Sequence, residues 1–174
     1  MTAEQAAHWL DRARWRAGPG VDPERLDALL AAARAALARA PAPRKAGRRK
    51  ALFALALAGE APDHLLKVER HGRRSLARRL GRGAAESELA RARACAARGV
   101  PTPLPLAAGT VRRRGLLEAT LLLLPIVPGA VDAARLWDGG RLPRARRRAL
   151  ARALGALVRT LHDAGIDQDD LAPN

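Results

Sequence analysis

The length of 174 residues corresponds to one domain, or to one domain and part of another, and the 48% hydrophobic residues, chiefly Ala and Leu, can form an aliphatic core. Its single cysteine excludes an internal disulfide, and we expect Cys95 to be a packed thiol in a reducing compartment. The net charge of +15 predicts an anionic partner such as phosphate, nucleic acid or lipid headgroups, unless the arginines merely occupy solvated helix faces.

The chain is predicted to begin with two helices. Thr2 and Gln5 match a capping box, and the helix that follows should end near residues 18–20, which read Gly-Pro-Gly. Asp22 is a good N-cap for the second helix, whose leucines repeat on one face. That second helix should end before the proline-containing connector at 40–43.

The middle of the chain is predicted to form a sheet with one helix. The apolar runs at 51–57 and 64–69 flank a turn that contains glycine and proline, which favours a β-hairpin. A helix is predicted from Ala84 to Gly99, because glycine commonly ends helices. Two short strands are predicted after it, near 104–108 and 116–124.

A long amphipathic helix is predicted from about Pro143, and it leads into the acidic segment 161–174. This segment reads Leu-His-Asp-Ala-Gly-Ile-Asp-Gln-Asp-Asp-Leu-Ala-Pro-Asn. It resembles the catalytic loop of the protein-kinase-like superfamily, whose usual form is Leu-His-x-x-Gly-Ile-x-His-x-Asp-Leu-x-Pro-x-Asn. The ungapped match places Asp170 at the catalytic aspartate, while Gln168 and Asp169 depart from the usual His and Arg.

The resemblance also implies metal-binding residues after the catalytic aspartate. A register shifted by one would pair Asp169 with Asn174 at the family's spacing, but it would lose the other matches, so we adopt Asp170. In that register the metal-binding Asn would be residue 175, and the Asp-x-Gly element would lie further on. We therefore expect a truncated kinase, with no metal ligand in this chain, that binds nucleotide weakly and does not turn over.

Lys67 and Glu88 are the candidate nucleotide-binding pair. Lys67 lies between apolar residues of the second predicted strand and needs an anionic partner, because burying a lone ammonium is costly. Phosphoryl transfer uses such a cation on the nucleotide phosphates, held by a carboxylate from a neighbouring helix. Glu88 is the candidate, with Glu86 as the alternative. In the competing interpretation, Lys67 is an exposed hairpin lysine and Glu88 pairs with a neighbouring arginine such as Arg91.

Gly47 is the candidate residue of the loop that covers the phosphates. It lies in the basic run at 44–50, directly before the first strand of the predicted hairpin. A single glycine is a weak signal, and the surrounding cations would either help to hold phosphates or simply be solvated.

Within the superfamily, the chain resembles bacterial lipopolysaccharide (Kdo-type) kinases most closely. The resemblance rests on residues 66–68, 87–89 and 99–103 together with the terminal loop, and it covers about residues 45–174. It implies that ATP, with Mg²⁺, donates its γ-phosphate to an alcohol group, a hydroxyl on a sugar of a lipopolysaccharide core.

The resemblance further implies an α+β, protein-kinase-like fold. Residues 1–43 would form an N-terminal helical extension, and residues 44–125 a small lobe made of an antiparallel sheet plus a helix. Residues 126–174 would form the start of a helical large lobe that ends in the catalytic loop.

Two other functions remain open at this point. One is a kinase of the same fold that acts on another small molecule or on a protein. The other is a basic helical protein that binds nucleic acid, although the few aromatic residues offer little base stacking. Because the chain has no signal peptide and no apolar run of the roughly 20 residues that cross a bilayer, we expect a cytoplasmic protein. Its charge suits peripheral contact with the anionic inner membrane surface.

Overall fold

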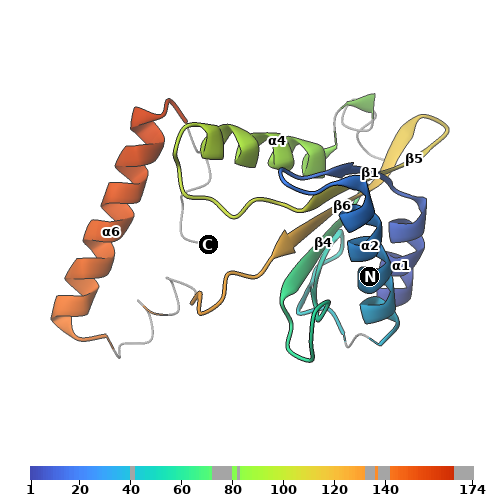
Figure 1. The fold of residues 1–174 in the computed structure, drawn as a ribbon, viewed down its shortest axis with the longest axis horizontal. Helices are drawn as coiled ribbons and strands as arrows, with labels where there is room; N and C mark the ends of the chain where they lie inside the picture. Colours follow the sequence, from blue (N-terminus) through green and yellow to red (C-terminus); the bar gives the residue numbers. More distant parts are fainter. Residues whose placement is uncertain (40–41, 72–79, 82, 132–135, 137–141, 167–174) are drawn as a thin grey trace. The chain divides into compact units, whose positions relative to one another are not determined.

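The computed structural model describes residues 1–39, 42–71, 80–81, 83–131, 136 and 142–166 (Figure 1). The chain forms two compact units. The first comprises Met1–Arg93 and Pro103–Val127, and the second comprises Ala94–Thr102 and Pro128–Asn174. The sheet and the side chains around Lys67 all belong to the first unit.

The first unit is built on a six-stranded antiparallel sheet with the strand order β1-β5-β6-β4-β3-β2. The strands are β1 (Arg14–Ala17), β2 (Lys45–Ala46), β3 (Lys50–Leu55), β4 (His64–Arg70), β5 (Ala107–Arg113) and β6 (Leu116–Pro125). Strands β3 and β4 are the hairpin predicted from the two apolar runs. The predicted α+β class and the antiparallel sheet of the small lobe are therefore confirmed.

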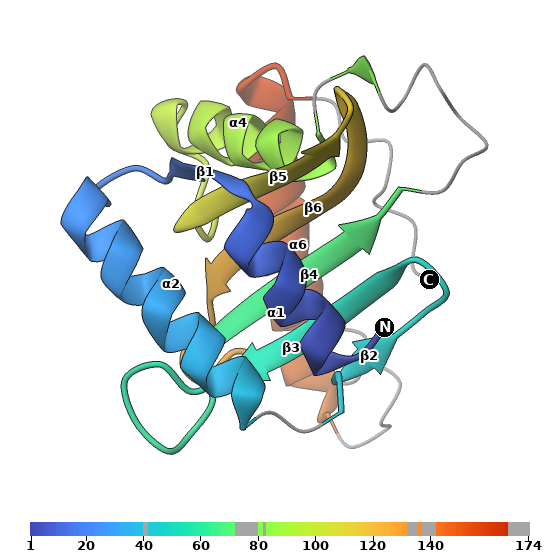
Figure 2. The ribbon, with the colours of Figure 1, turned by 90° about the vertical axis from the view of Figure 1, so that its right-hand side faces the viewer.

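One face of the sheet is covered by α1 (Ala3–Arg12) and α2 (Pro23–Ala38), which Figure 2 shows lying across the strands. Because side chains alternate along a strand, Phe53, Leu66 and Leu121 all point toward these helices, and each is almost fully buried. They pack with Trp9 of α1 and Leu37 of α2 in one core. The two leading helices therefore share their hydrophobic core with the sheet.

The opposite face carries α4 (Ala84–Ala97), which occupies the range predicted for a helix after residue 83. Ala85 and Leu89 of this helix pack on Ala108 of β5 and Leu122 of β6. Helix α4 thus covers the part of the face that β5 and β6 form. Beside it, Lys67 of β4 is only half-buried and lies on the same face.

The start of the chain differs from the prediction. The first helix ends at Arg12, not near residues 18–20, and Arg14–Ala17 form the edge strand β1 against β5. The Nε1–H of Trp15 donates to the carbonyl of Leu10 at 3.1 Å, and the indole lies against Gly109 of β5. A Cβ at Gly109 would come within 3.0 Å of the indole ring. This long-range contact, which local periodicity cannot reveal, stabilises a strand after the helix.

The second unit contains α6 (Arg144–Asp163), which begins directly after Pro143 as predicted. Leu161 of this helix is buried, whereas Leu154 and Leu157 are 43% and 40% exposed. None of the helices in the described parts of the chain is long and apolar enough to cross a membrane.

Candidate functional site

Lys67 lies in the middle of a row of residues that runs across the sheet. The strand register pairs Lys45 with Leu52, Leu52 with Lys67, Lys67 with Leu122, and Leu122 with Ala108. Residues paired in this way point to the same face of a sheet. Since Leu122 and Ala108 contact α4, the side chain of Lys67 points to the α4 face as well.

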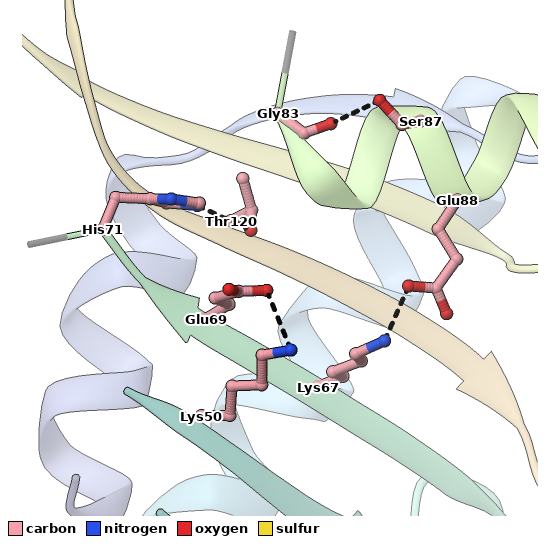
Figure 3. A network of polar contacts seen from close by, with 8 residues as sticks. All are labelled: Lys50, Lys67, Glu69, His71, Gly83, Ser87, Glu88 and Thr120. Atoms are coloured by element: carbon pink, nitrogen blue, oxygen red, sulfur yellow. Dashed lines mark hydrogen bonds and ion pairs between the residues drawn. The ribbon is translucent and has the colours of Figure 1, made fainter. Parts of the chain in front are cut away.

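Lys67 and Glu88 form an ion pair across this face. The Nζ of Lys67 donates to Oε2 of Glu88 at 2.6 Å, and the two side chains are 36% and 37% exposed (Figure 3). The sequence explains both positions. Leu66 and Val68 are buried on the α1–α2 face, so alternation turns Lys67 to the other face. Leu89 is buried against the sheet, and the preceding Glu88 therefore lies at the edge of this contact.

The structure thus forms the predicted pair and contradicts the competing interpretation. Lys67 is not an unpaired lysine of an exposed hairpin, and Glu88 does not pair with an arginine of its own helix. Arg93, one of those arginines, donates instead to the carbonyl of Ala17 at 2.8 Å. A half-exposed ion pair contributes only about 0–1 kcal/mol to stability, so stability alone gives little reason for this arrangement.

A second ion pair lies beside the first. Lys50 of β3 and Glu69 of β4 are cross-strand partners, and their Nζ and Oε2 atoms are 3.8 Å apart. Glu69 shares the face of Lys67 because it is two residues further along β4. Between Glu69, Lys67, Glu88 and Thr120 lies a cavity of only about 10 Å³, the size of one water molecule. This cavity is too small for any ligand larger than water.

The turn between β2 and β3 forms a cationic edge at the end of the β3–β4 hairpin where Lys50 pairs with Glu69. The N–H of Gly47 donates to the carbonyl of Lys50 at 2.7 Å and closes the turn. Its φ is not positive, and a Cβ there would meet only that carbonyl, at 3.7 Å. The fold therefore does not itself require glycine at this position. Lys45, Arg48, Arg49 and Lys50 are all exposed around it.

The other end of the hairpin is apolar on this face. The cross-strand register aligns Ala54 of β3, Leu65 of β4 and Leu124 of β6, and all three are half-buried. Leu52, which pairs with Lys67, extends this apolar surface toward the cationic end. The face therefore offers an apolar surface at one end and positive charge at the other, a combination that suits a flat base with attached phosphates.

Asp170, predicted as the catalytic aspartate, lies outside the described residues, as do Gln168 and Asp169. Glu86 lies on α4 with Glu88, and the carboxylate that contacts Lys67 is that of Glu88. Within the described ranges no three side chains of His, Cys, Asp or Glu lie close enough together to hold a metal ion.

Sequence reasoning missed a small network at the start of α4. Gly83 directly precedes this helix, and Thr120 of β6 lies beneath it with only 2% of its surface exposed. His71 Nε2 and Thr120 Oγ1 are 3.4 Å apart (Figure 3). Thr120, a polar residue inside the apolar run of β6, was the signal in the sequence that could have pointed to this network. The residues that it contacts, His71 and Gly83, are distant in sequence. This network bears on the position of Glu88.

Comparison with known proteins gives one match. Residues 45–174 match the family model described as Lipopolysaccharide kinase (Kdo/WaaP) family, which is three quarters of the chain. The match includes Gly47, Lys67 and Glu88 as well as the terminal loop with Asp170. No curated protein matches the chain, and no solved structure matches it either.

Proposed function

The chain belongs to the lipopolysaccharide kinase (Kdo/WaaP) family, and from this premise we propose that it binds ATP for transfer of the γ-phosphate to a sugar hydroxyl. The observation that carries the proposal is the Lys67–Glu88 ion pair at 2.6 Å on the open face of the sheet. Phosphoryl transfer uses a lysine on the nucleotide phosphates and a helix carboxylate that orients it. The pair lies within the residues that match the family.

The charges and apolar side chains of this face suggest how the nucleotide lies. The base would rest on Leu52, Ala54 and Leu65, which are half-buried and can lose more water to a flat ring. The phosphates would lie toward Lys67 and the cationic turn at Gly47, where positive groups compensate their charge. Glu88 would hold the ammonium of Lys67 in place for this contact.

The transfer itself would use Asp170 as the base. The acceptor hydroxyl attacks the γ-phosphorus, the bond from phosphorus to the β–γ bridging oxygen breaks, and ADP leaves with the electron pair. The hydroxyl proton passes to the Asp170 carboxylate. Magnesium, when bound, would neutralise charge on the phosphates.

Calorimetric titration with ATP tests the proposal. Removing the ammonium in Lys67→Met should weaken ATP binding at least about tenfold, because a charge-assisted contact to the phosphates is lost. Arg34→Met is the matched control. It also removes one cation from a helix–sheet unit and breaks an ion pair, Arg34–Asp11 at 3.0 Å, but on the α1–α2 side. ATP affinity that is equal in the two variants would contradict the proposal.

The acceptor and the membrane contact belong to the same proposal. The net charge of +15 and the arginines of α6 suit a sugar on an anionic glycolipid at a membrane surface. Sedimentation with vesicles that contain anionic phospholipid should carry the protein down, and zwitterionic vesicles should not. Salt-sensitive binding to RNA that Lys67→Met leaves unchanged, without ATP binding, would instead favour the nucleic-acid function.

A further inference from the structure

The start of α4 is held unusually close to the sheet at Gly83. The carbonyl of Gly83 accepts the N–H of Ser87 at 3.0 Å and the hydroxyl of Ser87 at 3.2 Å (Figure 3). Gly83 thus supplies the first carbonyl to which the helix is anchored. The position of Gly83 and the position of the first helical turn are coupled, because these hydrogen bonds tolerate changes in length of only a few tenths of an ångström.

No side chain fits at residue 83 without movement. A Cβ there would lie 2.8 Å from Cγ2 of Thr120, 3.5 Å from Oγ1 of Thr110 and 3.8 Å from Cδ1 of Leu117. Thr120 is 2% exposed, and a β-branched side chain in such packing cannot easily turn away. Gly83 has no positive φ, so close approach to β6, and not backbone conformation, explains the glycine.

Gly83 lies five residues before Glu88, roughly 7.5 Å along the helix axis at 1.5 Å per residue. A helix moves as a stiff body over this distance, and Leu89, packed on Leu122, is the next contact with the sheet. Lifting the first turn away from Thr120 therefore displaces Glu88 relative to Lys67. The bond between these two side chains, 2.6 Å long, would be lengthened or lost.

We propose that Gly83 and Thr120 are positioning residues, which set the distance of α4 from the sheet and so hold the Glu88 carboxylate on Lys67. The consequence for ATP binding rests on the function proposed above, whereas the consequence for the ion pair does not. The contact is a specific one between a backbone position and a single methyl group, Cγ2 of Thr120.

This contact suggests a pair of compensating substitutions. Gly83→Ala introduces the clashing Cβ. Thr120→Ser removes Cγ2, the atom at 2.8 Å, and keeps the hydroxyl that lies 3.4 Å from Nε2 of His71. The double variant should therefore relieve the clash. Gly59→Ala is the control for adding a methyl group, because nothing lies within 4 Å of its Cβ and its φ is not positive.

The ion pair can be followed without nucleotide. The sequence has three lysines, Lys45, Lys50 and Lys67, so [13Cε]lysine labelling gives three side-chain signals, and Lys67→Arg identifies one of them. The chemical shift of the Lys67 signal at constant pH reports its contact with Glu88, because the Cε atom is bonded to the Nζ that donates to the carboxylate at 2.6 Å. The signal in Glu88→Gln, where the carboxylate is absent, provides the reference position.

Gly83→Ala should move the Lys67 signal to its position in Glu88→Gln and weaken ATP binding about fivefold or more. Gly59→Ala should leave both unchanged, and the double variant should restore both. A Lys67 signal at its wild-type position in Gly83→Ala, even with a lower melting temperature, would overturn the proposal. If Gly83→Ala does not fold, the double variant decides: a Lys67 signal at its Glu88→Gln position in the folded double variant would also overturn the proposal.

The two proposals fail separately in this design. Absence of ATP binding by the wild-type protein would contradict the proposed function and leave the result for the Lys67 signal intact. Normal ATP binding together with a Lys67 signal that Gly83→Ala does not move would contradict only the positioning role.

Discussion

At the scale of single residues, the site depends on which carboxylate of α4 reaches the sheet. Glu86 and Glu88 are two positions apart, so they project about 200° apart around the helix at 3.6 residues per turn. Only the second is bonded to Lys67. The same helix therefore provides both the carboxylate of the proposed site and a matched control.

Glu88→Gln should weaken ATP binding about fivefold, or about 1 kcal/mol, because the amide no longer holds the ammonium by charge. Glu86→Gln should change the affinity less than about twofold. Neither variant should change the melting temperature much, since exposed pairs contribute little to stability. Calorimetry with ATP and a thermal melt measure both effects. A larger effect of Glu86→Gln would show that the wrong carboxylate has been assigned.

Gly47 allows function and fold to be separated. A Cβ at this residue has open space apart from the Lys50 carbonyl at 3.7 Å, and the backbone is not left-handed. Gly47→Ala should therefore melt like the wild type. If phosphates approach the backbone here, the added methyl group should still weaken ATP binding about threefold. Unchanged affinity would remove Gly47 from the site and leave the neighbouring cations as the phosphate contacts.

At the scale of elements, the β3–β4 hairpin is fixed by one carboxylate. Asp63 Oδ1 accepts the N–H of Leu57 at 2.8 Å, Oδ2 accepts the N–H of Ala58 at 2.9 Å, and Nδ1 of His64 lies 2.7 Å from Oδ1. Burial raises the pKa of Asp63, but the hydrogen bonds from Leu57, His64 and Ala58 outweigh it and lower the pKa to about 2. The turn thus prefers the ionised carboxylate.

This preference predicts a pH dependence of stability. Because the pKa of Asp63 falls from 3.8 to about 2 on folding, its contribution is complete above about pH 4 and is lost as the pH falls to about 2. Asp63→Asn should lower the free energy of unfolding at pH 7 by about 1 kcal/mol, after discounting for solvent screening. Urea unfolding of both proteins between pH 7 and 2.5 measures the difference. A difference that stays constant across this range would exclude the charge as its cause.

The elements that sequence reasoning found are those with strong local patterns. The hairpin runs and the helix after residue 83 have apolar periodicity and clear ends, and both are present. Strand β1 has only four residues, Arg-Trp-Arg-Ala, which is too short for a pattern, and it forms because β5 offers an edge. The predicted end of the first helix was wrong because the short strand that follows Arg12 could not be recognised from its sequence.

On the scale of the whole molecule, some residues of the site could be predicted from the sequence and others could not. Lys67 and Glu88 could be paired from sequence because a known family fixes their order, and the structure brings them to 2.6 Å. Gly83 and Thr120 are 37 residues apart and meet only because α4 docks on β6. Such a contact depends on tertiary packing, and neither residue has a reactive group that would draw attention in the sequence.

The whole first unit depends on residues that precede the family match, which begins at residue 45. Helices α1 and α2 bury Trp9, Leu10 and Leu37 against the sheet, with at most 8% of each exposed. Fully burying three such side chains contributes roughly 5–9 kcal/mol, which is comparable to the stability of an entire domain. Without these helices the sheet would expose its apolar face to water.

We therefore expect a chain that lacks residues 1–39 to be unfolded or aggregated, with no ATP binding, although every residue of the family match is present. Leu37→Ala should reproduce part of this effect, with a loss of about 2–5 kcal/mol, because Leu37 is 2% exposed. Leu157→Ala on α6 is the control, since the same truncation at a side chain 40% exposed should cost less than about 1 kcal/mol. Circular dichroism and urea unfolding distinguish these outcomes. A shortened chain that still folded and bound ATP would show that the sheet is stable without its N-terminal cover, and that residues 1–39 serve another purpose.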